Sequence, residues 1–165
     1  MNSSPFRFFA LVGVVSLSAT AHAGDLKVYP GANCHKYLGG GGGTPAEWWG
    51  TIQNQNADSD LIVVCPFVRD DDSQGHIASS GMLVLDRHPS LDVSCDMRME
   101  SVGWGGQVYV FSQNAHSSGY GNAETYVSFP DFYGLYFQYY YAFCSIPRAF
   151  SGTYSHIVYF SISEN

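Results

Sequence analysis

Residues 92–100 read Asp-Val-Ser-Cys-Asp-Met-Arg-Met-Glu, a strict alternation of polar and apolar side chains. Because successive side chains of a β-strand point to opposite faces, this period of two predicts a strand with one wet face and one dry face. Val93, Cys95, Met97 and Met99 all fall on the dry face. The pattern therefore predicts that Cys95 points into a core, where a buried disulfide belongs.

Other segments extend this β-pattern along the chain. The runs 61–65, 82–85 and 157–160 are apolar at every position, as expected for central strands of a packed sheet. Clusters of Gly, Asn, Asp, Ser and Pro separate the runs and mark turns. Eight or nine strands at this spacing, with no amphipathic helical pattern, predict an all-β fold, an antiparallel two-sheet sandwich of immunoglobulin-like or jelly-roll type.

Four cysteines, an even number, predict two disulfides in an exported chain. They are Cys34, Cys65, Cys95 and Cys144. A zinc site would need closer pairs such as C-x-x-C, which are absent from the sequence. Three pairings are possible, and we prefer Cys34–Cys65 with Cys95–Cys144, because the first bridge would fasten the glycine-rich segment Gly39–Gly43 to the core.

The N-terminal 23 residues have the pattern of a signal peptide. Arg7 precedes an apolar run from Phe8 to Leu17, and the small residues Ala21 and Ala23 occupy positions −3 and −1 of a cleavage site before Gly24. The run is about half as long as a membrane-spanning helix requires. We therefore expect residues 24–165 to form one domain without a membrane span, either secreted or periplasmic.

The charge of the chain argues against one class of partner. Its 14 acidic and 7 basic residues give a formal charge of −7, and removal of the segment containing Arg7 makes the rest more negative. Such a chain repels phosphate backbones, so nucleic-acid binding is not expected.

One acidic cluster is a candidate cation site. Asp70, Asp71 and Asp72 could supply carboxylate oxygens to calcium from a turn, although the spacing is not that of an EF-hand. The alternative is a solvated turn that protects the neighbouring apolar strand from aggregation. Neither the histidines nor the cysteines form a metal motif, and no cofactor is expected.

Catalytic motifs do not identify an enzyme. The sequence lacks a G-x-S-x-G elbow, and paired cysteines leave no thiol for nucleophilic chemistry. Its acidic residues offer too many pairs to select a glycosidase dyad. No catalytic residues are proposed.

Aromatic side chains are the strongest functional signal. Trp48 and Trp49 follow the five-glycine segment, while Trp104 and Tyr120 each stand between glycines. Because consecutive residues of a strand face opposite sides, we expect one of Trp48 and Trp49 to face the core and the other to face outward. An outward ring beside glycine offers a flat surface for a sugar ring or another protein. The alternative is that these rings fill the core.

Four short segments stand out in the sequence, namely Val-Cys-Pro-Phe-Val-Arg-Asp (64–70), Leu-Asp-Val-Ser-Cys (91–95), Phe-Cys-Ser-Ile-Pro (143–147) and Ser-His-Ile-Val-Tyr (155–159). With these segments the chain resembles exported four-cysteine proteins of Gram-negative soil bacteria, the myxobacteria especially. The resemblance implies an exported β-rich domain and transfers no catalytic residue.

Three function classes follow from these observations. The first is a non-catalytic secreted binding module whose ligand is a polysaccharide or a cell-surface component. The second is a structural or self-associating envelope or matrix protein, favoured by the Tyr- and Gly-rich composition with few charges. The third is a small hydrolase or protease inhibitor, the class that the sequence supports least.

Overall fold

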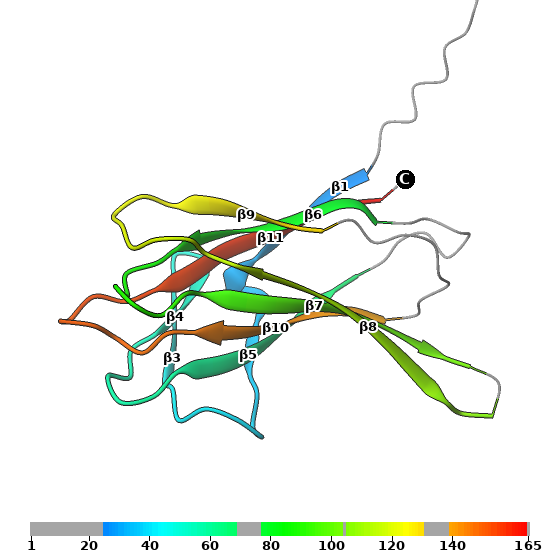
Figure 1. Cartoon of the computed structure of the whole chain (residues 1–165), viewed down its shortest axis with the longest axis horizontal. Coiled ribbons are helices and arrows are strands. Elements are labelled where there is room, and N and C mark those ends of the chain that lie inside the picture. Colours follow the sequence, from blue (N-terminus) through cyan, green and yellow to red (C-terminus); the bar gives the residue numbers. More distant parts are fainter. Residues whose placement is uncertain (1–24, 69–76, 104, 131–138, 165) are drawn as a thin grey trace, which may run out of the picture.

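The protein is an all-β sandwich of two antiparallel sheets packed face to face (Figure 1). The computed structural model describes residues 25–68, 77–103, 105–130 and 139–164. Within these ranges the chain forms eleven strands and one short 3-10 helix. The predicted fold class is confirmed, and the strand count exceeds the expected eight or nine because several strands are only two to four residues long.

Sheet A is six-stranded and has the order β3-β4-β11-β6-β9, with β1 also paired to β11. Its strands are β1 (Asp25–Pro30), β3 (Pro45–Trp48), β4 (Thr51–Asn54), β6 (Ile77–Leu85), β9 (Thr125–Phe129) and β11 (His156–Glu164). Strands β1 and β4 share one edge of β11, because β4 pairs with its first two residues and β1 with those from Tyr159 onward.

Sheet B is five-stranded and has the order β2-β5-β10-β7-β8. Its strands are β2 (His35–Lys36), β5 (Leu61–Phe67), β7 (Ser94–Val102), β8 (Val108–His116) and β10 (Tyr139–Ile146), and the helix η1 (Gly31–Asn33) lies between β1 and β2. Between β4 and β11 the chain crosses repeatedly from one sheet to the other. These strands have the order β4-β11-β6-β9 in sheet A and β5-β10-β7-β8 in sheet B. Two four-stranded halves connected in this way form a jelly roll, one of the two predicted sandwich types.

The core lies between the sheets and follows the alternation seen in the sequence. The dry-face residues Val93, Cys95, Met97 and Met99 are all buried. Sheet A contributes the opposite half of the core, including Ile52, Met82, Val84, Ile157 and Phe160.

Both disulfides have the preferred pairing, Cys34–Cys65 and Cys95–Cys144. Cys95 and Cys144 are direct partners in the register of β7 and β10, with their Cα atoms 4.0 Å apart. All four cysteines are buried in the core, which confirms that the Cys95 bridge is internal. Two such bridges indicate an oxidising environment outside the cytosol.

Proline lacks the N–H that a β-ladder uses, yet Pro66 does not end its strand. Strand β5 continues through Pro66 to Phe67. The Tyr37 main-chain N–H donates to Ile62 O (2.8 Å), so the main-chain groups of Ile62 point toward β2. Because this direction alternates along a strand, the main chain of Pro66 faces the same edge of the sheet. Strand β2 pairs only with Val63 and Val64, so the missing N–H of proline interrupts no ladder there.

Candidate functional site

The candidate site is a groove on the outer face of sheet A. Three neighbouring strands position its floor, because Ile52 of β4, Ile157 of β11 and Val84 of β6 point into the core. A residue adjacent to each of these in its strand therefore points outward, and these outward residues are Gln53, His156 and Leu85. His156 stands between the other two in the register of the sheet.

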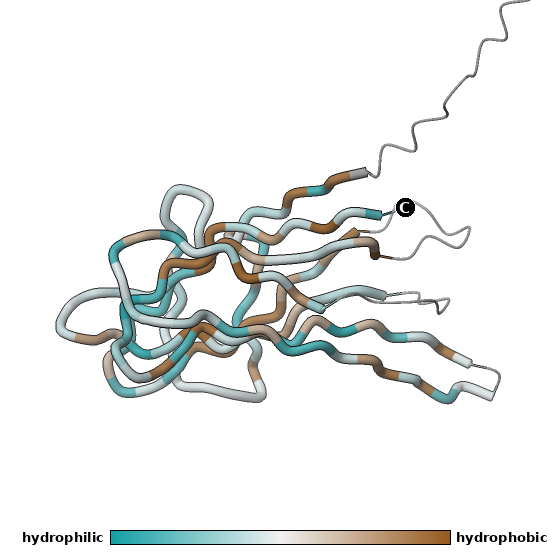
Figure 2. Tube along the Cα trace, turned by 45° about the horizontal axis from the view of Figure 1, so that its top comes forward, coloured by the Kyte–Doolittle hydropathy of each residue, from teal (hydrophilic) through white to brown (hydrophobic). Residues whose placement is uncertain are grey.

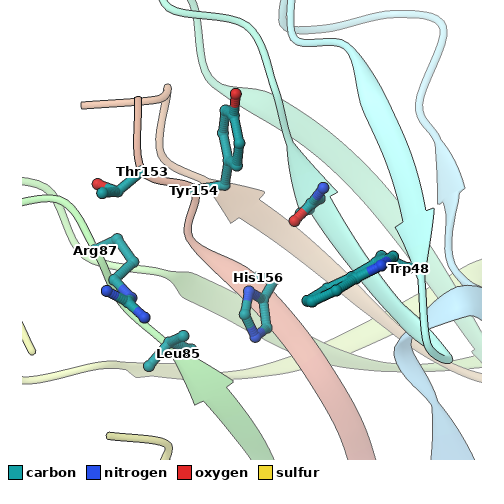
Figure 3. A pocket seen from close by; sticks show the side chains of 7 residues that line it. Trp48, Leu85, Arg87, Thr153, Tyr154 and His156 are labelled. Atoms are coloured by element: carbon teal, nitrogen blue, oxygen red, sulfur yellow. The ribbon is translucent and has the colours of Figure 1, made fainter. Parts of the chain in front are cut away.

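Loops and a neighbouring strand complete the walls of the groove. Trp48 comes from β3, Arg87 follows β6, and Thr153 and Tyr154 precede β11. Figure 3 shows the indole of Trp48 facing His156 across the groove, with Arg87 and Leu85 on the far side. The cavity volume is about 220 Å³. Since pockets for drug-sized ligands span roughly 300–1,000 Å³, this groove suits one ring of a longer ligand.

The β3–β4 hairpin exposes both tryptophans, so the prediction that one of them faces the core is wrong. Trp48 is 61 % exposed and Trp49 is 87 % exposed. Strand β3 ends at Trp48, which pairs with Thr51, so Trp49 and Gly50 form a two-residue turn with φ of 52° and 81°. Positive φ at both positions is typical of the type I′ turn. The alternation of a strand therefore does not extend to Trp49.

The turn holds the two indoles against each other. Their ring centroids are 6.2 Å apart and their planes are nearly perpendicular. A left-handed φ costs a non-glycine residue roughly 1–2 kcal/mol, so Trp49 occupies this position against its backbone preference. Strain of this kind, at an exposed aromatic residue beside a groove, is typical of binding sites.

Burial decides the protonation of His156 in the groove floor. Desolvation lowers the pKa of this imidazole, and the positive charge of Arg87 lowers it further. The carboxylate of Glu124 and a hydrogen bond to the Tyr154 backbone oppose this change, yet the pKa remains below its ordinary value. His156 is therefore neutral at pH 7, with one ring nitrogen able to donate and the other able to accept.

Arg87 is oriented by the loop between β8 and β9. Its guanidinium donates to the Asn122 side-chain oxygen, and the Gly121 N–H donates to Asp86 O (3.1 Å). The groove thus offers a flat indole face next to an amide, a neutral imidazole and a guanidinium. Mixed donors and acceptors around an apolar ring match the hydroxyl groups and C–H faces of a sugar.

A buried carboxylate behind the groove joins four segments of the chain. Asp86 accepts hydrogen bonds from the hydroxyls of Ser117 (2.6 Å) and Ser155 (3.1 Å) and from the His88 N–H (3.0 Å). Each serine in turn accepts a main-chain N–H, that of Val93 or of Arg87. This network fixes the chain on both sides of Arg87.

These residue types could form a Ser-His-Asp relay, but their contacts have a different order. In a catalytic triad the imidazole lies between the carboxylate and the serine. Here Asp86 contacts both serines directly, and Nδ1 of His88 accepts the main-chain N–H groups of Ser90 and Leu91. The network therefore supports the loops.

The other predicted site residues have different fates. Tyr120 lies in the β8–β9 loop and is 58 % exposed, but it does not line the groove. The two residues that follow it, Gly121 and Asn122, contact Asp86 and Arg87. Trp104, Asp70, Asp71 and Asp72 lie outside the described residues, so the calcium site stays a prediction. Elsewhere, the described ranges contain no group of three or more potential metal ligands.

A second hollow of about 400 Å³ lies against sheet B. It is lined by Val64, Pro66, Phe67, Glu100, Tyr139, Tyr140 and Tyr141. The Tyr141 hydroxyl donates to Glu100, and burial together with this carboxylate raises the tyrosine pKa. Two of the polar side chains that line this hollow, Glu100 and Tyr141, are thus bonded to each other.

Sequence reasoning found Trp48 but missed its partners. Gln53, Arg87, Tyr154 and His156 belong to separate segments that come together only through the pairing of β4, β11 and β6. No local motif marks these residues. The weak available signal was a polar residue beside an apolar strand, as at His156.

Comparison with protein-family models, curated proteins and solved structures gives no significant match. The resemblance to exported four-cysteine bacterial proteins therefore stays a prediction. Within the described ranges of the chain, no helix is long and apolar enough to cross a membrane.

Proposed function

We propose that the protein is a non-catalytic binding module that holds one sugar ring of a polysaccharide or cell-surface glycan against Trp48. The supporting observation is the groove itself, where an exposed indole faces the neutral His156 and lies near Gln53 and Arg87. A jelly roll hosts many unrelated functions, so the proposal rests on the site and not on the fold.

Each part of the groove has a role in this proposal. The Trp48 face packs against the apolar C–H face of the ring, while Gln53, His156 and Arg87 exchange hydrogen bonds with its hydroxyls. Trp49 extends the apolar surface at the tip of the hairpin. A groove that accommodates one ring and is open to solvent suits an internal unit of a polymer.

The proposed location is the cell exterior or the periplasm. It follows from the signal-peptide pattern in residues 1–23 and agrees with the two disulfides. Polysaccharides of cell walls and surfaces are abundant in both compartments.

Retention on insoluble polysaccharides tests the proposal. The disulfide-bonded protein is mixed with cellulose, chitin and insoluble xylan, and the bound fraction is measured for wild type, Trp48→Ala and Tyr139→Ala. Tyr139 has the same 61 % exposure as Trp48 but lies on the other sheet, so it is a matched control. We expect Trp48→Ala to weaken retention by about tenfold or more, as for a central aromatic contact, and Tyr139→Ala to leave it unchanged.

Two outcomes would overturn the proposal. One is wild-type protein that is retained on none of the glycans. The other is Trp48→Ala that is retained as well as wild type.

A further inference from the structure

Strand β8 is an open edge of sheet B. Among the described strands it pairs only with β7, in an uninterrupted register from Ser94↔His116 to Val102↔Val108. The described part of β10 begins at Tyr139, opposite Glu100, so the end of the β7–β8 hairpin extends beyond it. Figure 1 shows this hairpin projecting past the rest of the two sheets at the lower right.

The hydrogen-bond phase of β8 identifies which main-chain groups face outward. The Gly103 N–H donates to Gln107 O (2.7 Å), and at the other end the Ser117 N–H donates to Val93 O (2.9 Å). Bonded and non-bonded pairs alternate in an antiparallel ladder, and both ends give the same phase. The residues whose N–H and C=O groups point away from β7 are therefore Val108, Val110, Ser112, Asn114 and His116.

This edge lacks the features that normally prevent strand pairing. Natural edge strands carry lysine, proline or a bulge, or they are very short. Strand β8 has nine residues, Val-Tyr-Val-Phe-Ser-Gln-Asn-Ala-His, without proline, lysine or bulge. Val108, Tyr109 and Val110 are each more than half exposed, and Figure 2 shows hydrophobic positions along the projecting hairpin.

We infer that β8 pairs with β8 of a second copy of this chain, antiparallel across a two-fold axis. Ser112 is the middle residue of β8, so pairing over the full strand places it opposite its own copy. Every outward-facing residue then meets another outward-facing residue, and the strand is complementary to itself. The two five-stranded sheets become one continuous sheet.

Charge favours a second copy as the occupant. The chain is strongly acidic, so two copies repel each other over most of their surfaces. Strand β8 contains no Asp, Glu, Lys or Arg, and the carboxylate of Asp92 lies 3.3 Å from the imidazole of His116 at the end of the strand. Asp96 lies 3.5 Å from Arg98, and Glu100 accepts the Tyr141 hydroxyl. Pairing over the full strand therefore places no Asp, Glu, Lys or Arg of one β8 opposite such a residue of the other.

The test removes one outward N–H without disturbing the protein's own ladder. Ser112→Pro eliminates a donor that faces away from β7, a position that edge strands tolerate. Ser112→Ala is the matched control, because it removes the same hydroxyl and keeps the N–H. The mass of the disulfide-bonded protein is measured by sedimentation velocity over a range of concentrations.

We expect a concentration-dependent dimer for wild type and Ser112→Ala. Ser112→Pro raises the dimer dissociation constant by about tenfold or more, since it loses hydrogen bonds and adds a steric clash. Val110→Lys, which places a charge on the same edge, provides a second variant if Ser112→Pro fails to fold by circular dichroism.

The inference is overturned if wild type remains monomeric at about millimolar concentration. That result would also be found if the β8 edge pairs with a strand of a different protein. The inference is also overturned if a folded Ser112→Pro or Val110→Lys dimerises as strongly as wild type. The groove at Trp48 takes no part in the pairing, so neither outcome bears on glycan binding.

Discussion

The β3–β4 and β7–β8 hairpins both expose large apolar side chains, but they expose them beside different chemistry. In β3–β4 the indole of Trp48 adjoins polar side chains, namely Gln53, His156 and Arg87. In β7–β8 the apolar residues lie along an edge whose main-chain N–H and C=O groups face outward. Exposed apolar surface therefore does not define a ligand by itself, because the neighbouring hydrogen-bonding groups distinguish a glycan from a second β-strand.

The disulfide at the base of the β7–β8 hairpin gives the largest expected effect. Replacing Cys95 and Cys144 by alanine opens a loop of 49 residues and lowers the free energy of unfolding by about 4 kcal/mol. Urea unfolding measures the change. The control, alanine at Cys34 and Cys65, opens a 31-residue loop and should cost slightly less. A loss below about 1 kcal/mol would show that the bridge does not secure the hairpin.

The carboxylate behind the groove comes next in size. Asp86→Ala leaves the buried donors of Ser117, Ser155 and the His88 main chain without their acceptor. We expect a loss of about 3 kcal/mol in urea unfolding, because each orphaned donor keeps its desolvation cost. Unchanged stability would mean that the walls of the groove are held by other contacts.

The strained turn of the β3–β4 hairpin gives a smaller effect of opposite sign. Trp49→Asn creates the Asn-Gly pair that a type I′ turn prefers, and it should raise the free energy of unfolding by about 1 kcal/mol. Trp48→Asn, one residue earlier and on the strand, gains nothing from the turn. A stability loss in Trp49→Asn would contradict the assignment of strain to Trp49.

His156 gives the smallest effect and a defined pH window. Its folded pKa lies below the 6.5 of the unfolded chain, so the unfolded chain binds the proton first as the pH falls. The free energy of unfolding should therefore decrease as the pH drops below about 6.5 and level off below the folded pKa. His156→Gln, measured by urea unfolding from pH 8 to 5, should lose less stability over this interval than wild type. An identical pH dependence in the two proteins would argue against a buried neutral imidazole.

Much of the scaffold could be predicted because its signals are local. The alternation in 92–100 indicated both a strand and an inward Cys95, and period two requires nothing from the rest of the chain. The preferred disulfide pairing was also correct. Its physical basis, the register that places Cys95 opposite Cys144, could not be derived from sequence.

The site was less predictable because it depends on pairing between distant segments. Gln53, Leu85 and His156 become neighbours through the ladders of β4, β11 and β6, and nothing in their local sequence determines that order. Trp49 was misjudged for a different reason. Alternation was assumed to continue through it, whereas Trp49 and Gly50 adopt the left-handed conformations of a turn.

An NMR titration would test the central claim most directly. The protein, labelled with nitrogen-15, is titrated with a soluble oligosaccharide of the polymer that retains it, and the indole signal of Trp48 is assigned with Trp48→Phe. We predict shifts of the Trp48 indole and of the Gln53 and His156 amides, with the amides of Val108 and Val110 unmoved. Shifts confined to the β7–β8 hairpin, or to the hollow against sheet B that includes Tyr139, would contradict the assignment of the groove at Trp48 as the glycan site.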